Sequence, residues 1–144
     1  MVLIKSKKKE IEMKFIIYTS KATENMTSKD ISDILLKARR NNQSMGITGA
    51  LFYNDGMFLQ ILEGFDEIID GLVATISEDN RHNDFKILFE GAKDNSDFTD
   101  WSMGEIPIDS IELAPSILSN INKDKIDLAT AQKIIDEAKA ICSN

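Results

Sequence analysis

The chain has 144 residues, of which 42% are hydrophobic and 28% charged, and this composition predicts one soluble domain with a sizeable core. Its formal net charge of -7 disfavours a nucleic-acid binder, because phosphate backbones attract clustered positive charge, and no apolar run reaches the roughly 20 residues of a membrane helix. One cysteine excludes an internal disulfide and one histidine disfavours a histidine metal site, so without a signal peptide we expect a cytoplasmic protein.

The first predicted elements are a basic tail, a strand and a helix. Residues 1–12 are rich in lysine, and we interpret them as a solvated tail, with a surface for acidic partners as the alternative. Residues 14–18 form an apolar strand. Thr27 followed by Asp30 indicates a helix N-terminus, and an apolar stripe then follows at helical spacing. The stripe comprises Ile31, Ile34, Leu35 and Ala38, and Asn42 closes it.

The middle of the chain predicts a hairpin, a second helix and further strands. Two strand-like runs within residues 47–64 are separated by Asn54-Asp55-Gly56, a strong hairpin signal. A helix with a broad apolar stripe runs from about residue 66 to residues 79–80. A strand follows at 85–90, and a short extended piece at 101–103. The order βαββαβ(β) predicts an α+β fold with a ferredoxin-like sheet.

The hairpin is apolar on both of its faces. Phe58 and Leu62 share one face, and Met57, Leu59 and Ile61 share the other. Since two helices in this topology cover only one face of the sheet, the other face needs a second cover. We expect residues 109–144 to form a helical extension, whose short helix near Pro115 and longer helix within 128–142 pack there. Cys142 is interpreted as an apolar residue of that longer helix.

Three polar side chains interrupt these apolar faces. Tyr18 lies in the first strand, Asn42 in the first helix and Gln60 in the hairpin, on the face of Phe58 and Leu62. A buried amide without a partner costs roughly 1–3 kcal/mol, so Gln60 must find hydrogen bonds. A core glutamine bonded to the backbone is the alternative for Gln60 alone, but the three segments are predicted to be neighbours. Together they predict a polar site.

Six short segments resemble the BLUF family, the flavin-binding sensors of blue light. They are residues 17–20, 38–42, 46–49, 56–64, 81–82 and 100–104, and their order and spacing make the resemblance specific. The resemblance covers about residues 13–105 and implies a flavin-binding domain over residues 13–108. It also implies the ferredoxin-like fold that the periodicity predicts by a partly independent route.

The resemblance implies a role for each of the three polar residues. The flavin ring would lie between the two helices, with Tyr18 as the donor of an electron and a proton, Gln60 between Tyr18 and the ring, and Asn42 at the ring's polar edge. A phenol with an ordinary pKa of about 10 keeps its proton at neutral pH. A rearranged amide changes which ring atoms receive hydrogen bonds, so we expect light to shift absorption to the red.

Further residues around the flavin are also implied by the resemblance. Positive charge for its phosphates would come from Arg40, Arg81 and His82, although a solvated helix face for Arg40 and a surface loop for His82 remain alternatives. The other expected contacts are Ile34, Asn41, Ile76 and Asp79. Asn41 stands where some relatives carry histidine. We expect FAD, and FMN or riboflavin is also compatible because the ring is common to all three.

Trp101 and Met103 are expected to relay the signal. Because they alternate in an extended run, they are predicted to point to the same side while Ser102 points away. Either is a candidate neighbour of Gln60, and their shift would carry the signal to the C-terminal helices. For Trp101 the alternative is a core anchor.

The resemblance implies a photoreceptor without enzymatic activity. We expect no output domain after residue 105, and therefore signalling through a homo-oligomer or a separate downstream protein partner. A small hydrolase similar to acylphosphatases is one alternative. It would need an arginine in the loop after the first strand, but the only basic residue of that stretch, residues 19–26, is Lys21. A flavin-free interaction module is the other.

Overall fold

The computed structural model describes residues 12–142, so the expected basic tail lies outside the described residues except for Glu12. The helices and strands follow in the order β1 (Met13–Ala22), α1 (Ser28–Met45), β2 (Thr48–Asn54), β3 (Met57–Phe65), α2 (Asp66–Ser77), β4 (His82–Lys93), β5 (Gly104–Glu105), a 3-10 helix (Ile108–Leu113), α3 (Pro115–Asn120) and α4 (Leu128–Ile141). In this described part, no helix combines the length and apolar character that crossing a membrane requires.

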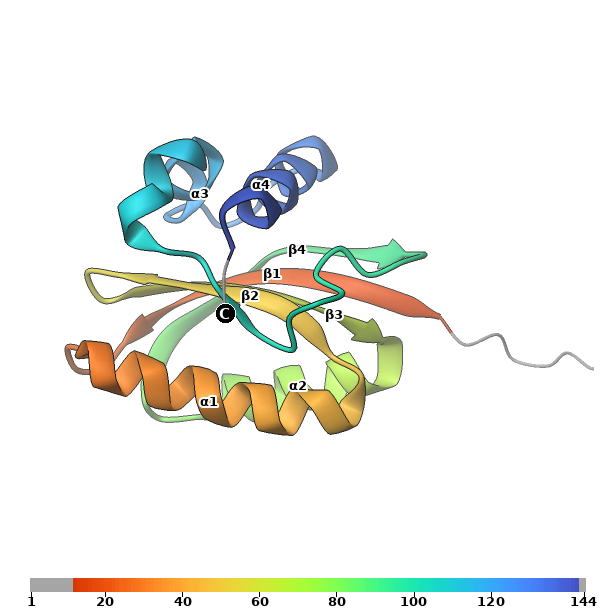
Figure 1. The fold of residues 1–144 in the computed structure, drawn as a ribbon, viewed down its shortest axis with the longest axis horizontal. Helices are drawn as coiled ribbons and strands as arrows, with labels where there is room; N and C mark the ends of the chain where they lie inside the picture. Colours follow the sequence, from red (N-terminus) through yellow and green to blue (C-terminus); the bar gives the residue numbers. More distant parts are fainter. Residues whose placement is uncertain (1–11, 143–144) are drawn as a thin grey trace, which may run out of the picture.

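The sheet has the predicted ferredoxin-like topology. Its strand order is β4-β1-β3-β2-β5, with β1 antiparallel to both β3 and β4, and β5 parallel to β2. Figure 1 shows α1 and α2 on one face of the sheet and α3 and α4 on the other. The prediction of two helices on one face and a C-terminal helical pair on the opposite face is therefore confirmed.

Local sequence signals explain how these elements begin and end. At the start of α1, the Thr27 side chain accepts from the Asp30 N–H at 3.1 Å, and the Asp30 carboxylate accepts from the Thr27 N–H at 2.9 Å. Gly46 ends the helix in the left-handed region, with φ of 69°. The turn between β2 and β3 places Asp55 at φ 51° and Gly56 at φ 82°, the positive angles that two-residue hairpin turns require.

The two faces of the sheet belong to two separate apolar clusters. Alternate residues of β3 face opposite sides, so Phe58 and Leu62 pack toward α1 and α2, while Leu59 and Ile61 pack toward α3 and α4. The four side chains are at most 8% exposed. Both faces of the hairpin are therefore buried, as its apolar pattern predicts.

The segment between β4 and β5 differs from its prediction. Residues 101–103 are not a strand, and Trp101 and Met103 do not point to the same side: Trp101 packs with the α3 and α4 cluster, whereas Met103 is buried in the α1 and α2 cluster. The physical reason is that side chains of α1 bind the backbone carbonyls of Ser102 and Met103, at 2.9 and 2.7 Å, while β2 contributes one bond, from the Gly49 N–H to the Trp101 carbonyl at 3.3 Å. The domain boundary between residues 108 and 109 stays a prediction.

Candidate functional site

A large cavity lies between α1 and α2, over β1 and β3. Its volume is about 1170 Å³, and small-molecule sites commonly span about 300–1,000 Å³. Apolar side chains from both helices and from the hairpin form its walls. These are Ile34, Leu51, Phe58, Leu62, Ile68, Leu72 and Ile76. Tyr18, Ser20, Asn42 and Gln60 add polar groups to this lining. The cavity thus suits a flat ligand with apolar faces and a polar edge.

Tyr18, Gln60 and Met103 form one line of hydrogen bonds beside the cavity. Tyr18 and Gln60 are directly opposite each other in β1 and β3, which places both side chains on the same face. The Tyr18 hydroxyl donates to Gln60 Oε1, and Gln60 Nε2 donates to Met103 Sδ at 3.3 Å. The three residues are 5%, 7% and 0% exposed. Both ends of the Gln60 amide therefore have a hydrogen-bond partner, as a buried amide requires.

The environment of Tyr18 keeps its phenol protonated. Burial raises the pKa of the Tyr18 hydroxyl well above its usual range, and the negative charge of Asp79 raises it further. The ring lies against Phe85, with 4.7 Å between the ring centroids. At neutral pH, Tyr18 is consequently a neutral hydrogen-bond donor.

The inner side of α1 supplies an amide and a guanidinium. Asn42 Nδ2 donates to the Ser102 carbonyl at 2.9 Å, and Arg39 Nε donates to the Met103 carbonyl at 2.7 Å. Arg39 and Asn42 are three residues apart, so they share one face of the helix. Asn42 is 3% exposed and also lines the cavity, which fits the predicted buried position at the end of the apolar stripe.

Charged groups gather where α2 passes into β4. Arg81 Nη2 lies 2.6 Å from Asp79 Oδ2, and the Arg81 N–H donates to Asp79 Oδ1 at 2.9 Å. These bonds lower the pKa of the Asp79 carboxyl to about 2. His82 Nε2 donates to the Ile76 carbonyl at 2.6 Å, because a carbonyl can only accept. The side chains are thus fixed in place along the lining of the cavity.

The structure brings most of the predicted site residues together. The residues that line the cavity include Tyr18, Ile34, Asn41, Asn42, Gln60, Ile76, Asp79, Arg81 and His82. Arg40 is exposed and is not part of this lining. Met103 reaches the site through Gln60, whereas Trp101 packs on the other side of the sheet.

Two residues at the site escaped the sequence analysis. Ser20 lies two residues after Tyr18 in β1, and this spacing could have placed it on the same face. Its hydroxyl is buried in the cavity lining and has no hydrogen-bond partner within residues 12–142. Arg39 had no comparable signal, because its partner is 64 residues away in the sequence. The unpaired hydroxyl of Ser20 is costly when buried, and a ligand in the cavity can supply its missing hydrogen bond.

The residues of the cavity fit a flavin. Its walls are apolar enough for the faces of a tricyclic ring, the amides of Asn42 and Gln60 suit a polar ring edge, and the hydroxyl of Ser20 offers one more group. Arg81 and His82 lie on the same lining, with the guanidinium of Arg81 paired to Asp79, and both carry nitrogen donors that suit phosphate oxygens.

Comparison with known proteins gives a consistent result. The sequence model of BLUF, described as sensors of blue light using FAD, matches residues 13–104. A photoactivated adenylate cyclase subunit beta of Euglena longa is 34% identical over 104 residues, which cover 71% of this chain and 12% of that protein. A subunit alpha of Euglena gracilis is 32% identical over 110 residues, with 75% and 11% covered. The chain spans about an eighth of the length of these relatives or less.

Solved structures of similar fold cover nearly the whole chain. The dark-state structure of BlrB, a BLUF protein, has a TM-score of 0.78 and 26% sequence identity, covering 90% of this chain and 97% of that one. The photo-activated state of BlsA has a TM-score of 0.75 and 28% identity, covering 88% of this chain and 94% of that one.

Proposed function

The chain belongs to the BLUF family of flavin-binding sensors of blue light, and on this premise we propose that Tyr18 and Gln60 are its light-responsive pair. The observation that carries the proposal is the line of hydrogen bonds from Tyr18 through Gln60 to Met103 along the wall of the cavity. The flavin ring would occupy the cavity between α1 and α2, with Asn42 at its polar edge.

The chemistry of these side chains suits a photochemical switch. A bound flavin supplies an excited state that can accept an electron. Tyr18 would give up an electron to that excited state and its hydroxyl proton toward Gln60 Oε1, its hydrogen-bond acceptor, and both would return to Tyr18, so that only the hydrogen bonds have changed. Gln60 donates at one end and accepts at the other, so rotation or tautomerisation of the amide reverses the pattern that faces the ring. Absorption would then shift to the red without conversion of any substrate.

A pair of tyrosine variants tests the proposal. The sequence contains two tyrosines, and Tyr53 lies outside the cavity lining, where its hydroxyl accepts from the Met26 N–H at 3.2 Å. Both Tyr18→Phe and Tyr53→Phe should purify with flavin. Light-minus-dark absorption spectra should show the red shift in Tyr53→Phe and in the parent, but not in Tyr18→Phe. A parent that takes up no flavin, or a Tyr18→Phe variant that cycles like the parent, would overturn the proposal.

We propose FAD as the native flavin. The support is the description of the matching family as sensors using FAD, together with the donors of Arg81 and His82 in the lining, which suit the phosphates that riboflavin lacks. Asn41 and Asp79 are proposed neighbours of the same part of the cofactor, and Arg40 could meet only a phosphate that extends beyond the cavity. Chromatography of the pigment released on denaturation separates FAD, FMN and riboflavin, and riboflavin alone would contradict the proposed phosphate contacts.

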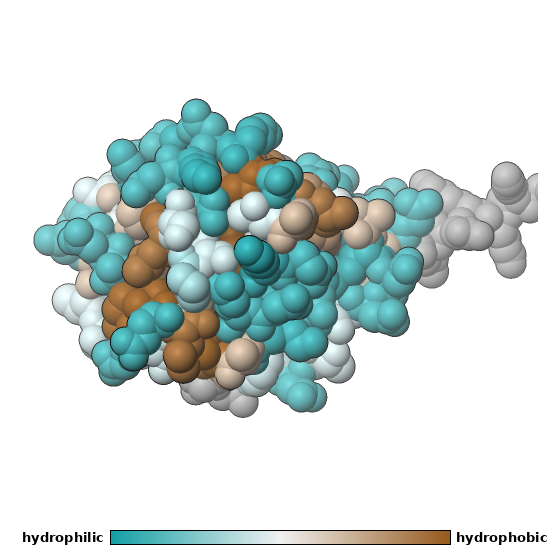
Figure 2. All heavy atoms as spheres, turned by 90° about the horizontal axis from the view of Figure 1, so that it is seen from above, coloured by the Kyte–Doolittle hydropathy of each residue, from teal (hydrophilic) through white to brown (hydrophobic). Residues whose placement is uncertain are grey.

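The output is proposed to be a change in assembly or in partner contacts. The relatives from Euglena are subunits of photoactivated cyclases, whereas residues 13–104 here are proposed to sense light without being an enzyme. Figure 2 shows apolar areas on the face that carries α3 and α4. Exposed large apolar side chains of this region are Ile108, Leu113, Leu118 and Leu128. Light scattering in the dark and under blue light tests this, and a monomer in both conditions would contradict the homo-oligomer.

The cytoplasm remains the proposed location. The sequence has a single cysteine, while small secreted domains commonly depend on disulfides. Fractionation of expressing cells, with the flavin absorption as the marker, tests this assignment.

A further inference from the structure

The segment that joins β4 to β5, residues 94–103, is held near both of its ends by charged side chains. Glu63 of β3 binds it near the start, and Arg39 of α1 binds it at the end. Neither side chain lines the cavity. Their hydrogen bonds attach this segment, and with it Met103, to β3 and α1.

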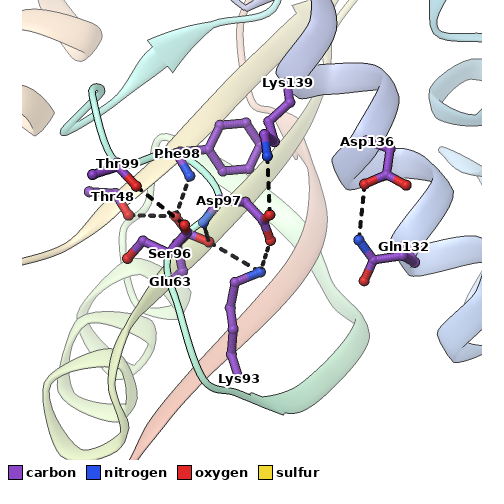
Figure 3. Close-up of polar contacts among 10 residues, drawn as sticks. All are labelled: Thr48, Glu63, Lys93, Ser96, Asp97, Phe98, Thr99, Gln132, Asp136 and Lys139. Atoms are coloured by element: carbon purple, nitrogen blue, oxygen red, sulfur yellow. Dashed lines mark hydrogen bonds and ion pairs between the residues drawn. The ribbon is translucent and has the colours of Figure 1, made fainter.

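Glu63 makes the first attachment, which Figure 3 shows. Its carboxylate is fully buried and accepts from the backbone N–H groups of Asp97 and Phe98 at 2.9 and 2.7 Å. The Thr48 hydroxyl donates to the same carboxylate at 2.6 Å, and Lys93 Nζ lies 3.3 Å away. A buried carboxylate with this many partners fixes the turn after β4.

Arg39 makes the second attachment. Its Nε donates to the Met103 carbonyl at 2.7 Å, and its Nη2 is buried without a hydrogen-bond partner within residues 12–142. A hydrogen bond from a charged donor is worth more than one between neutral groups. Because Asn42 binds the preceding carbonyl, two consecutive peptide groups are attached to one face of α1.

Met103 is therefore held at two atoms, one bound to Arg39 and the other to Gln60. Its carbonyl is held by Arg39, and its sulfur accepts from Gln60 Nε2 at 3.3 Å. We propose that Arg39 is a positioning residue for the photoresponse, which holds Met103 against Gln60 while Glu63 anchors the other end of the segment. The proposal rests on the proposed function of Gln60 and assigns a role to a residue that does not touch the cavity.

The test uses Arg39→Gln, which removes the charge, Arg39→Lys, which keeps it, and Lys29→Gln as the matched control. Lys29 is on the same helix, with its side chain 81% exposed. In the flavin-loaded protein in the dark, amide hydrogen exchange of residues 101–106 should be about tenfold faster in Arg39→Gln, the factor expected for one lost hydrogen bond to a charged group. Arg39→Lys should lie between Arg39→Gln and the parent, and Lys29→Gln should match the parent.

Two further readouts complete the test. Trp101 is the only tryptophan of the chain, so tryptophan emission in the dark reports on the surroundings of this one residue of the segment and should shift in Arg39→Gln. The amplitude of the light-minus-dark spectrum should fall in Arg39→Gln and stay unchanged in Lys29→Gln. Unchanged exchange of residues 101–106, an equal rise across the whole chain, or an unchanged amplitude would overturn the proposal. If the parent itself does not respond to light, the proposed function fails, while dark exchange still decides whether Arg39 holds the segment.

Discussion

The two faces of the sheet are both apolar, yet they are completed in different ways. On the side of α3 and α4, the cluster around Phe52, Leu59 and Ile135 is filled by side chains, each fully buried. On the side of α1 and α2, the same strands leave a cavity of about 1170 Å³ and carry the buried polar groups of Tyr18 and Gln60.

This difference in packing suggests that one face of the sheet mainly provides stability and the other mainly provides function. Close packing contributes most where a side chain has neighbours all around it, as on the α3 and α4 face. A cavity with buried hydrogen-bonding groups forgoes that packing, and a ligand can restore it. The α3 and α4 face should therefore govern the free energy of unfolding, whereas the α1 and α2 face should govern the bound pigment and its response.

Truncation of one phenylalanine on each face of the hairpin should produce the largest effect. Phe52 is fully buried under α3 and α4, so Phe52→Ala should lower the free energy of unfolding by about 3–5 kcal/mol. Phe58 lies beside the cavity, so Phe58→Ala should lower it by less, and should weaken flavin binding more. Urea denaturation and flavin titration measure the two quantities, and equal effects of both variants on both would break the comparison.

A large side chain in the cavity should displace the flavin, with less effect on the free energy of unfolding than Phe52→Ala. Ala38 lines the cavity from α1, and a tryptophan there would occupy space that the flavin ring needs. Overpacking a defined site costs about 1–3 kcal/mol, so Ala38→Trp should weaken flavin binding by about tenfold or more. The ratio of flavin to protein absorbance after purification checks this. Undiminished flavin content in a folded Ala38→Trp protein would place the pigment elsewhere.

A pH effect at the Asp79 and Arg81 pair should be the smallest. Because the pKa of Asp79 is lowered to about 2, its contribution to stability is present above pH 4 and is lost as the pH falls through 2. The side chains are 29% and 57% exposed, so solvent screens the pair and limits the contribution to less than about 1 kcal/mol. The difference in unfolding free energy between the parent and Asp79→Asn should be present at pH 6 and vanish near pH 2. A difference that persists at pH 2 would contradict the ion pair as its source.

Periodicity predicted both faces of the sheet because each side chain of a strand or helix follows a local rule. The alternation in β3 placed Phe58 and Gln60 on one face and Leu59 on the other, and helical spacing placed Asn42 inward. The polar site could be predicted for the same reason, since Tyr18, Asn42 and Gln60 each lie on a face that is otherwise apolar. The identity of the expected ligand, a flavin, came only from the resemblance to BLUF proteins.

The segment of Trp101 and Met103 was predicted wrongly because most of its hydrogen-bond partners are distant in the sequence. Its conformation depends on Asn42 and Arg39, which lie 60 and 64 residues away from the carbonyls that they bind. An extended pattern in the sequence is a poor guide where side chains of a distant helix bind the backbone of the segment. Arg39 itself looks like an ordinary charged residue of α1 until the fold brings Met103 beside it.

The central claim is that Gln60 is the group whose hydrogen bonds change on illumination. Its most direct test is the light-minus-dark absorption spectrum of Gln60→Leu, compared with the parent and with Gln132→Leu, a glutamine of α4 whose amide binds Asp136 on the exposed surface. All three proteins should bind flavin, and only the parent and Gln132→Leu should show a reversible red shift. A red shift of parental size in Gln60→Leu would contradict the account.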